Sequence, residues 1–200
     1  MSPRRSAANA ALTRAAIVDR AVARASIEGL EGLTIGTLAE ELGLSKAGVV
    51  GPFGSKEELQ LAALRRAFDI FKEEVWLPAA DLAAGRRRLA AICENWIGYL
   101  TRRVFPGGCF MTTAATEWDA RPGAIHDAVA AGQRRWLATL QADAEVAVRA
   151  GELPPDTDPA QLAFELNGVA MSLNQALLLF DDERAPSRAR RAMHRLVARA

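Results

Sequence analysis

Side chains that could serve as nucleophiles, general bases or metal ligands are few and scattered in this 200-residue chain. The two histidines, His126 and His194, stand far apart and lack the His-x-x-x-His spacing of a metal site. The two cysteines, Cys93 and Cys109, are too few for a disulfide framework or a cysteine-based zinc site. Because nothing assembles an acid, a base and a nucleophile, we expect no enzymatic activity, no metal and no cofactor. A regulator that uses Cys93 or Cys109 as a redox-sensing thiol stays open as an alternative.

Residues 35–53, IGTLAEELGLSKAGVVGPF, have the spacing that a helix-turn-helix requires. Ala39 is small enough for two helix backbones to cross closely, and Gly43 can take the positive φ of a tight turn. Val49 would then point back into the angle between the two helices. An ordinary turn between two helices of a bundle has a similar pattern, so the flanking residues have to decide between the two interpretations.

The elements around this segment are all predicted to be helices. Apolar residues recur at spacings of three and four, and no alternating Val/Ile/Thr-rich run with a hairpin turn appears. Gly29 can end the first helix, and the third helix must finish before Pro52. Side chains that can cap helix starts precede the first four helices, at Thr13, Thr34, Ser45 and Ser55.

The chain as a whole predicts an all-α fold of about nine helices in two domains. Residues 1–56 are expected to form a three-helix helix-turn-helix domain for DNA binding, with residues 1–12 as a flexible arm. Residues 57–200 are expected to form a larger helical bundle. Helices of the bundle are predicted at about 56–78, 81–104, 108–118, 122–150, 158–180 and 187–200.

Composition favours a globular protein that stays in the cytoplasm. The chain is 50% hydrophobic and 24% charged, and its net charge of +1 leaves only a local patch for any contact with nucleic acid. The first fourteen residues contain no continuous apolar stretch, which argues against a secretory signal. The apolar segment 166–180 is interrupted by amide side chains and is shorter than the roughly 20 residues of a membrane span, so we expect no membrane partner.

The stretch from Thr13 to Leu64 resembles the N-terminal domain of TetR-family regulators. The segments that carry this resemblance are Glu28-Gly29, Thr34, Gly43-Leu44-Ser45-Lys46 and Phe53-Gly54-Ser55-Lys56-Glu57-Glu58-Leu59. In addition, Phe105-Pro106-Gly107-Gly108-Cys109-Phe110, followed by Arg121-Pro122-Gly123, is similar to one branch of the family's C-terminal domains. The resemblance implies a homodimer that binds a palindromic operator on double-stranded DNA. It also implies that residues 57–200 form a ligand-sensing and dimerisation domain. The protein would then be a repressor that releases the DNA when a small molecule enters this domain.

By this resemblance, Lys46 and Lys56 match phosphate-contacting positions, and a lysine beside helix N-terminal amides suits a phosphate. The expected DNA-contacting residues are Thr37, Ser45, Lys46, Ala47, Gly48, Val50, Gly51 and Lys56. Val50, Gly51 and Pro52 depart from the family, which usually has aromatic residues here, and they offer no side-chain donors to base edges. A helical adaptor that has lost DNA binding is therefore a second alternative.

The expected dimer interface combines an apolar stripe on the helix 158–180 with the last helix. Its residues are Leu162, Leu166, Val169, Leu173 and Leu177 on the first helix, and Met193, Leu196 and Val197 on the second. The same stripe could instead face the core of one protomer.

The expected effector site is an apolar cleft with a few polar groups, which would take a small hydrophobic or aromatic compound. Ordinary core packing would also explain most of the large side chains involved. The candidate residues are Phe68, Phe71, Asn95, Trp96, Tyr99, Phe110, Met111, Trp136, Leu140, Asn167, Met171 and Asn174.

Overall fold

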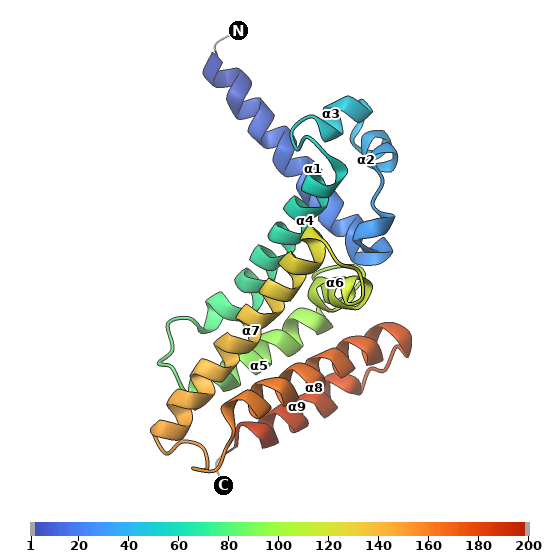
Figure 1. Ribbon diagram of the computed structural model, residues 1–200. Coiled ribbons are helices and arrows are strands. Elements are labelled where there is room, and N and C mark those ends of the chain that lie inside the picture. Colours follow the sequence, from blue (N-terminus) through green and yellow to red (C-terminus); the bar gives the residue numbers. More distant parts are fainter. Residues whose placement is uncertain (1–2, 199–200) are drawn as a thin grey trace. The chain divides into compact units, whose positions relative to one another are not determined.

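The computed structural model describes residues 3–198, with side chains from residue 8 onward. This part of the chain contains helices and no β-strand, which confirms the all-α prediction (Figure 1). The nine α-helices are α1 (Pro3–Gly32), α2 (Ile35–Leu42), α3 (Lys46–Val50), α4 (Lys56–Phe71), α5 (Arg86–Thr101), α6 (Phe110–Trp118), α7 (Ala124–Arg149), α8 (Pro159–Leu179) and α9 (Ala185–Leu196).

The predicted caps of the short N-terminal helices are present. The hydroxyl of Thr34 accepts a hydrogen bond from the amide of Thr37 at 3.1 Å, and that of Ser45 accepts one from Gly48 at 3.0 Å. Gly43 ends α2 in the left-handed conformation, with φ of 63°. The hydroxyls of Thr34 and Ser45 each satisfy a helix-terminal amide that would otherwise be unpaired, so α2 and α3 begin where the sequence predicts.

The start of α1 differs from the expectation. The helix begins at Pro3, so the described part of the expected flexible arm, residues 3–12, is helical. This stretch is rich in alanine, which has the highest helix propensity. Thr13 is therefore not a cap: it lies inside the helix, and its hydroxyl donates to the carbonyl of Asn9 at 3.0 Å. The backbone breaks at Gly29 (φ 77°, ψ 167°), near the predicted end, before a last turn up to Gly32.

The chain divides into two compact units, which we describe separately. The first comprises Met1–Asp69 and Phe105–Val129, and the second comprises Ile70–Val104 and Ala130–Ala200. α4 and α7 each contribute residues to both units. The functional division into residues 1–56 and 57–200 stays a prediction.

In the first unit, α2 and α3 pack against each other as a helix-turn-helix, and α2 also packs on α1 (Figure 1). Ala39 and Val49 are buried at the crossing of α2 and α3, together with Leu38. Ile17 and Ala21 of α1 are also buried. Burial of these apolar side chains is the main force that holds so short a helix as α3 in place.

In the second unit, α8 packs on α9 and on α5. The start of α5 is fixed by carboxylates: Asp143 accepts from the amide of Gly85 at 3.3 Å, and Glu152 accepts from the amide of Arg86 at 2.9 Å. These acceptors satisfy backbone donors at a helix N-terminus, where negative charge is favourable. The helix predicted from residue 81 begins at Arg86 for this reason.

The segment after α4 leaves the α-helical geometry earlier than predicted. A π-helical turn (Lys72–Trp76) and a 3₁₀ turn (Leu77–Ala79) continue the chain to the predicted end near Pro78. Proline cannot donate a backbone hydrogen bond, so the regular ladder cannot continue past it. Nδ2 of Asn95 on α5 donates to the carbonyl of Val75 in this turn at 3.1 Å.

α8 is more apolar than the sequence argument assumed. Over Pro159–Leu179 it is long and apolar enough to cross a membrane by length and composition, and 33% of the most apolar window is buried. The expectation that this segment is too short is therefore wrong as a matter of length. A core helix of a soluble protein passes the same test, and Leu162, Leu166 and Leu173 of α8 are buried in the second unit.

Candidate DNA interface and effector site

The start of α3 places a lysine beside the start of α2. Lys46 is exposed, and a β-carbon at Gly36 would lie 3.7 Å from its Cε, so the lysine side chain runs alongside the first turn of α2. The backbone amides at the start of a helix carry a partial positive charge. A side-chain ammonium next to such a helix start is suited to bind a phosphate.

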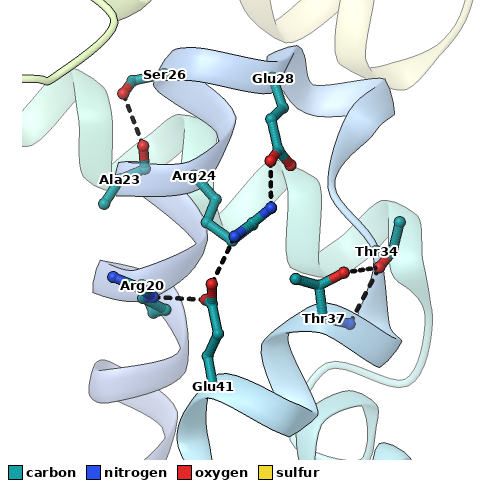
Figure 2. Close-up of polar contacts among 8 residues, drawn as sticks. All are labelled: Arg20, Ala23, Arg24, Ser26, Glu28, Thr34, Thr37 and Glu41. Atoms are coloured by element: carbon teal, nitrogen blue, oxygen red, sulfur yellow. Dashed lines mark hydrogen bonds and ion pairs between the residues drawn. The ribbon is translucent and has the colours of Figure 1, made fainter.

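Thr37 lies in the same turn of α2 and is held in place by Thr34. The two hydroxyls are 2.7 Å apart and share a hydrogen bond, as Figure 2 shows. The threonine hydroxyl can still accept or donate one more hydrogen bond. Thr37 is thus fixed in the first turn of α2, the turn alongside which Lys46 runs.

Lys56, the second predicted phosphate contact, has a partner within the protein. Its Nζ donates to the carbonyl of Glu31 at 3.0 Å, and the side chain is half-buried. Ser55 caps the start of α4 by accepting from the amide of Glu58 at 3.1 Å. An ammonium has three donors, so Lys56 keeps hydrogens for a phosphate while it fixes the end of α1.

The outer surface of α3 is small and almost free of polar side chains. Ala47, Gly51 and Pro52 are exposed, and Gly48 and Val50 are half-exposed. A β-carbon at Gly51 would lie 2.8 Å from the carbonyl oxygen of Ala47, which explains a glycine at this position. Within residues 46–52, Lys46 carries the only side-chain hydrogen-bond donor.

An ion-pair network that the sequence analysis missed joins α1 to α2. The carboxylate of Glu41 accepts from Nε of Arg20 at 2.6 Å and from Nη1 of Arg24 at 2.5 Å, and Arg24 also pairs with Glu28 (Figure 2). The bond from Arg20 lowers the pKa of the Glu41 carboxyl and raises that of Arg20. Glu41 lies 17 to 21 residues from its two arginine partners, so no local pattern could have predicted these two pairs.

In the second unit, four of the predicted effector residues form one aromatic cluster. Phe71 meets Trp96, Tyr99 and Trp136 edge to face, with ring centroids 4.8–5.8 Å apart. Trp96 and Trp136 also meet edge to face at 5.1 Å. All four rings are buried.

Two polar atoms in this aromatic cluster lack a partner among the described residues. They are the indole Nε1 atoms of Trp96 and Trp136, whose side chains are 4% and 8% exposed. A buried donor without an acceptor costs about 1–3 kcal/mol. An acceptor atom of a ligand would remove that cost.

The other predicted effector residues are placed differently. The side-chain amide nitrogen of Asn95 already donates a hydrogen bond to the carbonyl of Val75 in the π-helical turn. Asn167 donates to Sδ of Met171 at 3.5 Å, and Met171 is 42% exposed, so this pair lies on the surface of α8. Leu140 and Asn174 are buried in the second unit. The remaining three residues belong to the first unit: Phe68, Phe110 and Met111.

Most of the predicted dimer residues face the interior of the second unit. Leu162, Leu166, Leu173, Met193 and Val197 are buried there, and the other three are half-buried: Val169, Leu177 and Leu196. The exposed large apolar residues at this end of the chain are instead Phe164, Met171, Leu178, Leu179 and Phe180. The surface of α8 and α9 also has a hollow lined largely by small side chains, including Ser172, Ala176, Ala185, Ala189 and Ala192.

Both cysteines are buried, which disfavours the redox alternative. Burial raises the pKa of the Cys93 thiol to about 12, with a further contribution from the nearby charge of Glu94. The thiolate is the reactive form, so Cys93 is unreactive near neutral pH.

The described residues combine a helix-turn-helix with a larger helical bundle, and comparison with known families identifies the class of protein as a transcription regulator. The chain belongs to the TetR family. Residues 10–63 match the family described as "Bacterial regulatory proteins, tetR family". Residues 85–193, more than half of the chain, match "Tetracyclin repressor-like, C-terminal domain". Proteins of this family regulate transcription by binding DNA and are not enzymes.

Solved structures of TetR-family regulators have the same fold. A regulator from Chloroflexus aurantiacus is 23% identical, with a TM-score of 0.85 over 92% of this chain and 93% of that one. A putative regulator from Saccharomonospora viridis, solved with choline, is 22% identical, with a TM-score of 0.79 over 94% and 96%. AibR, solved with isovaleryl coenzyme A and operator DNA, is 22% identical, with a TM-score of 0.73 over 90% and 95%. No curated protein sequence gives a significant match.

Proposed function

We propose that this protein is a ligand-responsive repressor that binds a palindromic operator as a homodimer in the cytoplasm, where bacterial DNA lies. The observation that carries the proposal is Lys46, which lies exposed at the start of α3 and runs alongside the first turn of α2. A helix-turn-helix with such a lysine has the features of a phosphate-binding head. AibR, which shares the fold, was solved on operator DNA.

The DNA contacts fall into two kinds. Thr37, Ser45, Lys46 and Lys56 supply hydroxyl and ammonium groups for the phosphates, which position the protein on the duplex. Ala47, Gly48, Val50 and Gly51 supply a small apolar surface that allows close approach to the bases and to thymine methyl groups.

The dimer interface is proposed to lie on the exposed face of α8. Five exposed residues recur there at steps of four, three, four and three, as in a helix that packs on a partner helix: Phe164, Gly168, Met171, Gln175 and Leu178. A β-carbon at Gly168 would meet nothing within 4 Å, so the surface is open at that point. The small side chains in the hollow between α8 and α9 would let a second copy approach closely.

The proposed effector binds at the aromatic cluster of Phe71, Trp96, Tyr99 and Trp136. The rings favour an apolar or aromatic body, and the two unpartnered indole groups favour an acceptor oxygen on it. Choline, present in the Saccharomonospora viridis structure, has a hydroxyl oxygen and a cation that aromatic faces attract. Choline and isovaleryl coenzyme A are therefore the first probes to test by tryptophan fluorescence, with Trp96→Phe and Trp136→Phe as variants that keep a ring but lose the donor.

The proposal is tested by measuring binding to the DNA upstream of the protein's own gene. We expect a shifted band at low salt that a competitor of unrelated sequence removes only at higher concentration. A chain that shifts no duplex at low salt would instead be the adaptor that has lost DNA binding.

A further inference from the structure

The end of α1 is a short turn whose backbone groups are bound from two sides. We call residues 29–32 the connecting turn, because they link the break at Gly29 to the segment before α2. The amides of Leu30 and Glu31 both donate to the carboxylate of Glu117 on α6, at 2.7 and 2.8 Å. Each carboxylate oxygen accepts one of the two bonds, so the carboxylate fixes the position and direction of both amides.

The carbonyls of the same two residues are held by α4. Nε2 of Gln60, which is buried, donates to the carbonyl of Leu30 at 2.6 Å, and Nζ of Lys56 donates to that of Glu31 at 3.0 Å. The connecting turn is thus bound to α6 through its amides and to α4 through its carbonyls. Two residues after it, Thr34 caps α2.

A second close contact joins the loop before α6 to α1. The amide of Gly107 donates to Oγ of Ser26 at 3.3 Å, and a β-carbon at Gly107 would lie 1.7 Å from the carbonyl oxygen of Ser26. At Gly29, a β-carbon would lie within 2.8 Å of the carboxylate atoms of Glu117. A side chain at Gly107 would force one backbone away from the other, whereas a side chain at Gly29 would displace the carboxylate of Glu117.

The sequence assigns these contacts to different parts of the protein. Gly107 and Glu117 lie in the segment 85–193 that matches the C-terminal domain of the family, whereas the connecting turn lies in the segment 10–63 that matches its DNA-binding domain. Residues 105–129 are nevertheless part of the compact unit that contains the helix-turn-helix. A portion of the C-terminal domain is therefore built into the DNA-binding unit.

We propose that Glu117 is a positioning residue for DNA binding: its carboxylate holds the connecting turn, and through it α2 and α3, in the orientation that fits the operator. Loss of this carboxylate lowers DNA affinity without any change in the residues that touch DNA. This inference rests on the DNA binding proposed above.

The test compares three variants of the full chain. Glu117→Ala removes both acceptors, Glu117→Gln keeps one acceptor oxygen, and Asp119→Ala is the control, since it removes an exposed carboxylate next to the same helix. Affinity for the duplex upstream of the gene is measured by fluorescence anisotropy, and amide hydrogen exchange is measured at Leu30 and Glu31. We expect Glu117→Ala to bind about tenfold more weakly, Glu117→Gln to fall in between, and Asp119→Ala to bind as the parent does.

Hydrogen exchange separates positioning from a general loss of stability. We expect faster exchange at Leu30 and Glu31 in Glu117→Ala, with unchanged exchange at Ile17 and Ala21 in the core of α1. Accelerated exchange throughout α1 would overturn the inference, because weaker binding would then follow from unfolding. DNA affinity equal to that of the parent in Glu117→Ala would also overturn it. A parent chain that binds no DNA contradicts the proposed function, and unchanged exchange at Leu30 and Glu31 then contradicts the role of Glu117 by itself.

Discussion

Arg88 and Asp143 form an ion pair in which Nε and Nη2 of the arginine donate to a carboxylate that is 0% exposed, at 2.6–3.0 Å. The hydrogen bond to Asp143 raises the pKa of Arg88. We expect Arg88→Ala to lower the free energy of unfolding by about 3–5 kcal/mol, because it leaves a buried charge without its partner. Urea denaturation measures the change.

The control for this prediction is Arg190→Ala, whose pair with Glu94 at 2.9 Å is exposed on both sides. An exposed pair contributes about 0–1 kcal/mol. If both variants lost the same free energy of unfolding, burial of Asp143 would not determine how much the ion pair stabilises the fold.

Glu41 makes stability depend on pH in the acid range. Its pKa is lowered in the folded protein, first by the hydrogen bond from Arg20, so the folded state binds this proton less tightly than the unfolded state does. The stabilisation is therefore present above the ordinary pKa of 4.5 and is lost as the pH falls through the lower folded value. We expect Glu41→Gln to lose less stability than the parent between about pH 5 and pH 3. Parallel curves of denaturation midpoint against pH would contradict this.

Lys46 is expected to contribute one phosphate contact in each helix-turn-helix of the dimer. Lys46→Ala should weaken binding to all duplexes and reduce the slope of log affinity against log salt by about one unit per lysine lost. Anisotropy titrations over a series of salt concentrations measure the slope. Lys72→Ala, which removes an exposed lysine outside the helix-turn-helix, is the control and should leave the slope unchanged.

The exposed face of α8 is expected to hold the dimer together. Phe164→Glu together with Met171→Glu places charges on two exposed apolar positions, 68% and 42% exposed in one chain, and should give a monomer that keeps its helical content. Light scattering measures the mass. Leu77→Glu, at a 49% exposed position in the second unit, is the control. A double variant that stays dimeric would place the interface elsewhere.

The helix-turn-helix could be predicted from residues close together in the sequence. Contacts between residues far apart in the sequence could not be predicted. Thr34, Ser45 and Gly43 act within three or four residues, so their roles can be predicted from spacing alone. Glu117 binds the amide of Leu30, 87 residues away, and no periodicity reveals such a pairing.

The dimer stripe shows a different limit of prediction. α8 has apolar residues on two faces, one with Leu166 and Leu173 in the core and one with Phe164 and Met171 exposed. Apolar residues that recur with the helical period of 3.6 identify each apolar face. The pattern does not say which of the two faces the rest of the protein covers. The arrangement of α5 and α9 against α8 decides it.

The nearly featureless outer surface of α3 has a consequence for finding the genes this protein controls. Side chains that could hydrogen-bond to base edges are missing at Ala47, Gly48, Val50 and Gly51. Aligned binding sites should therefore show low information content at the positions that α3 faces, and higher content where the DNA must bend or narrow. The distance between half-sites and the flexibility of the DNA between them should identify its operators better than a consensus sequence would.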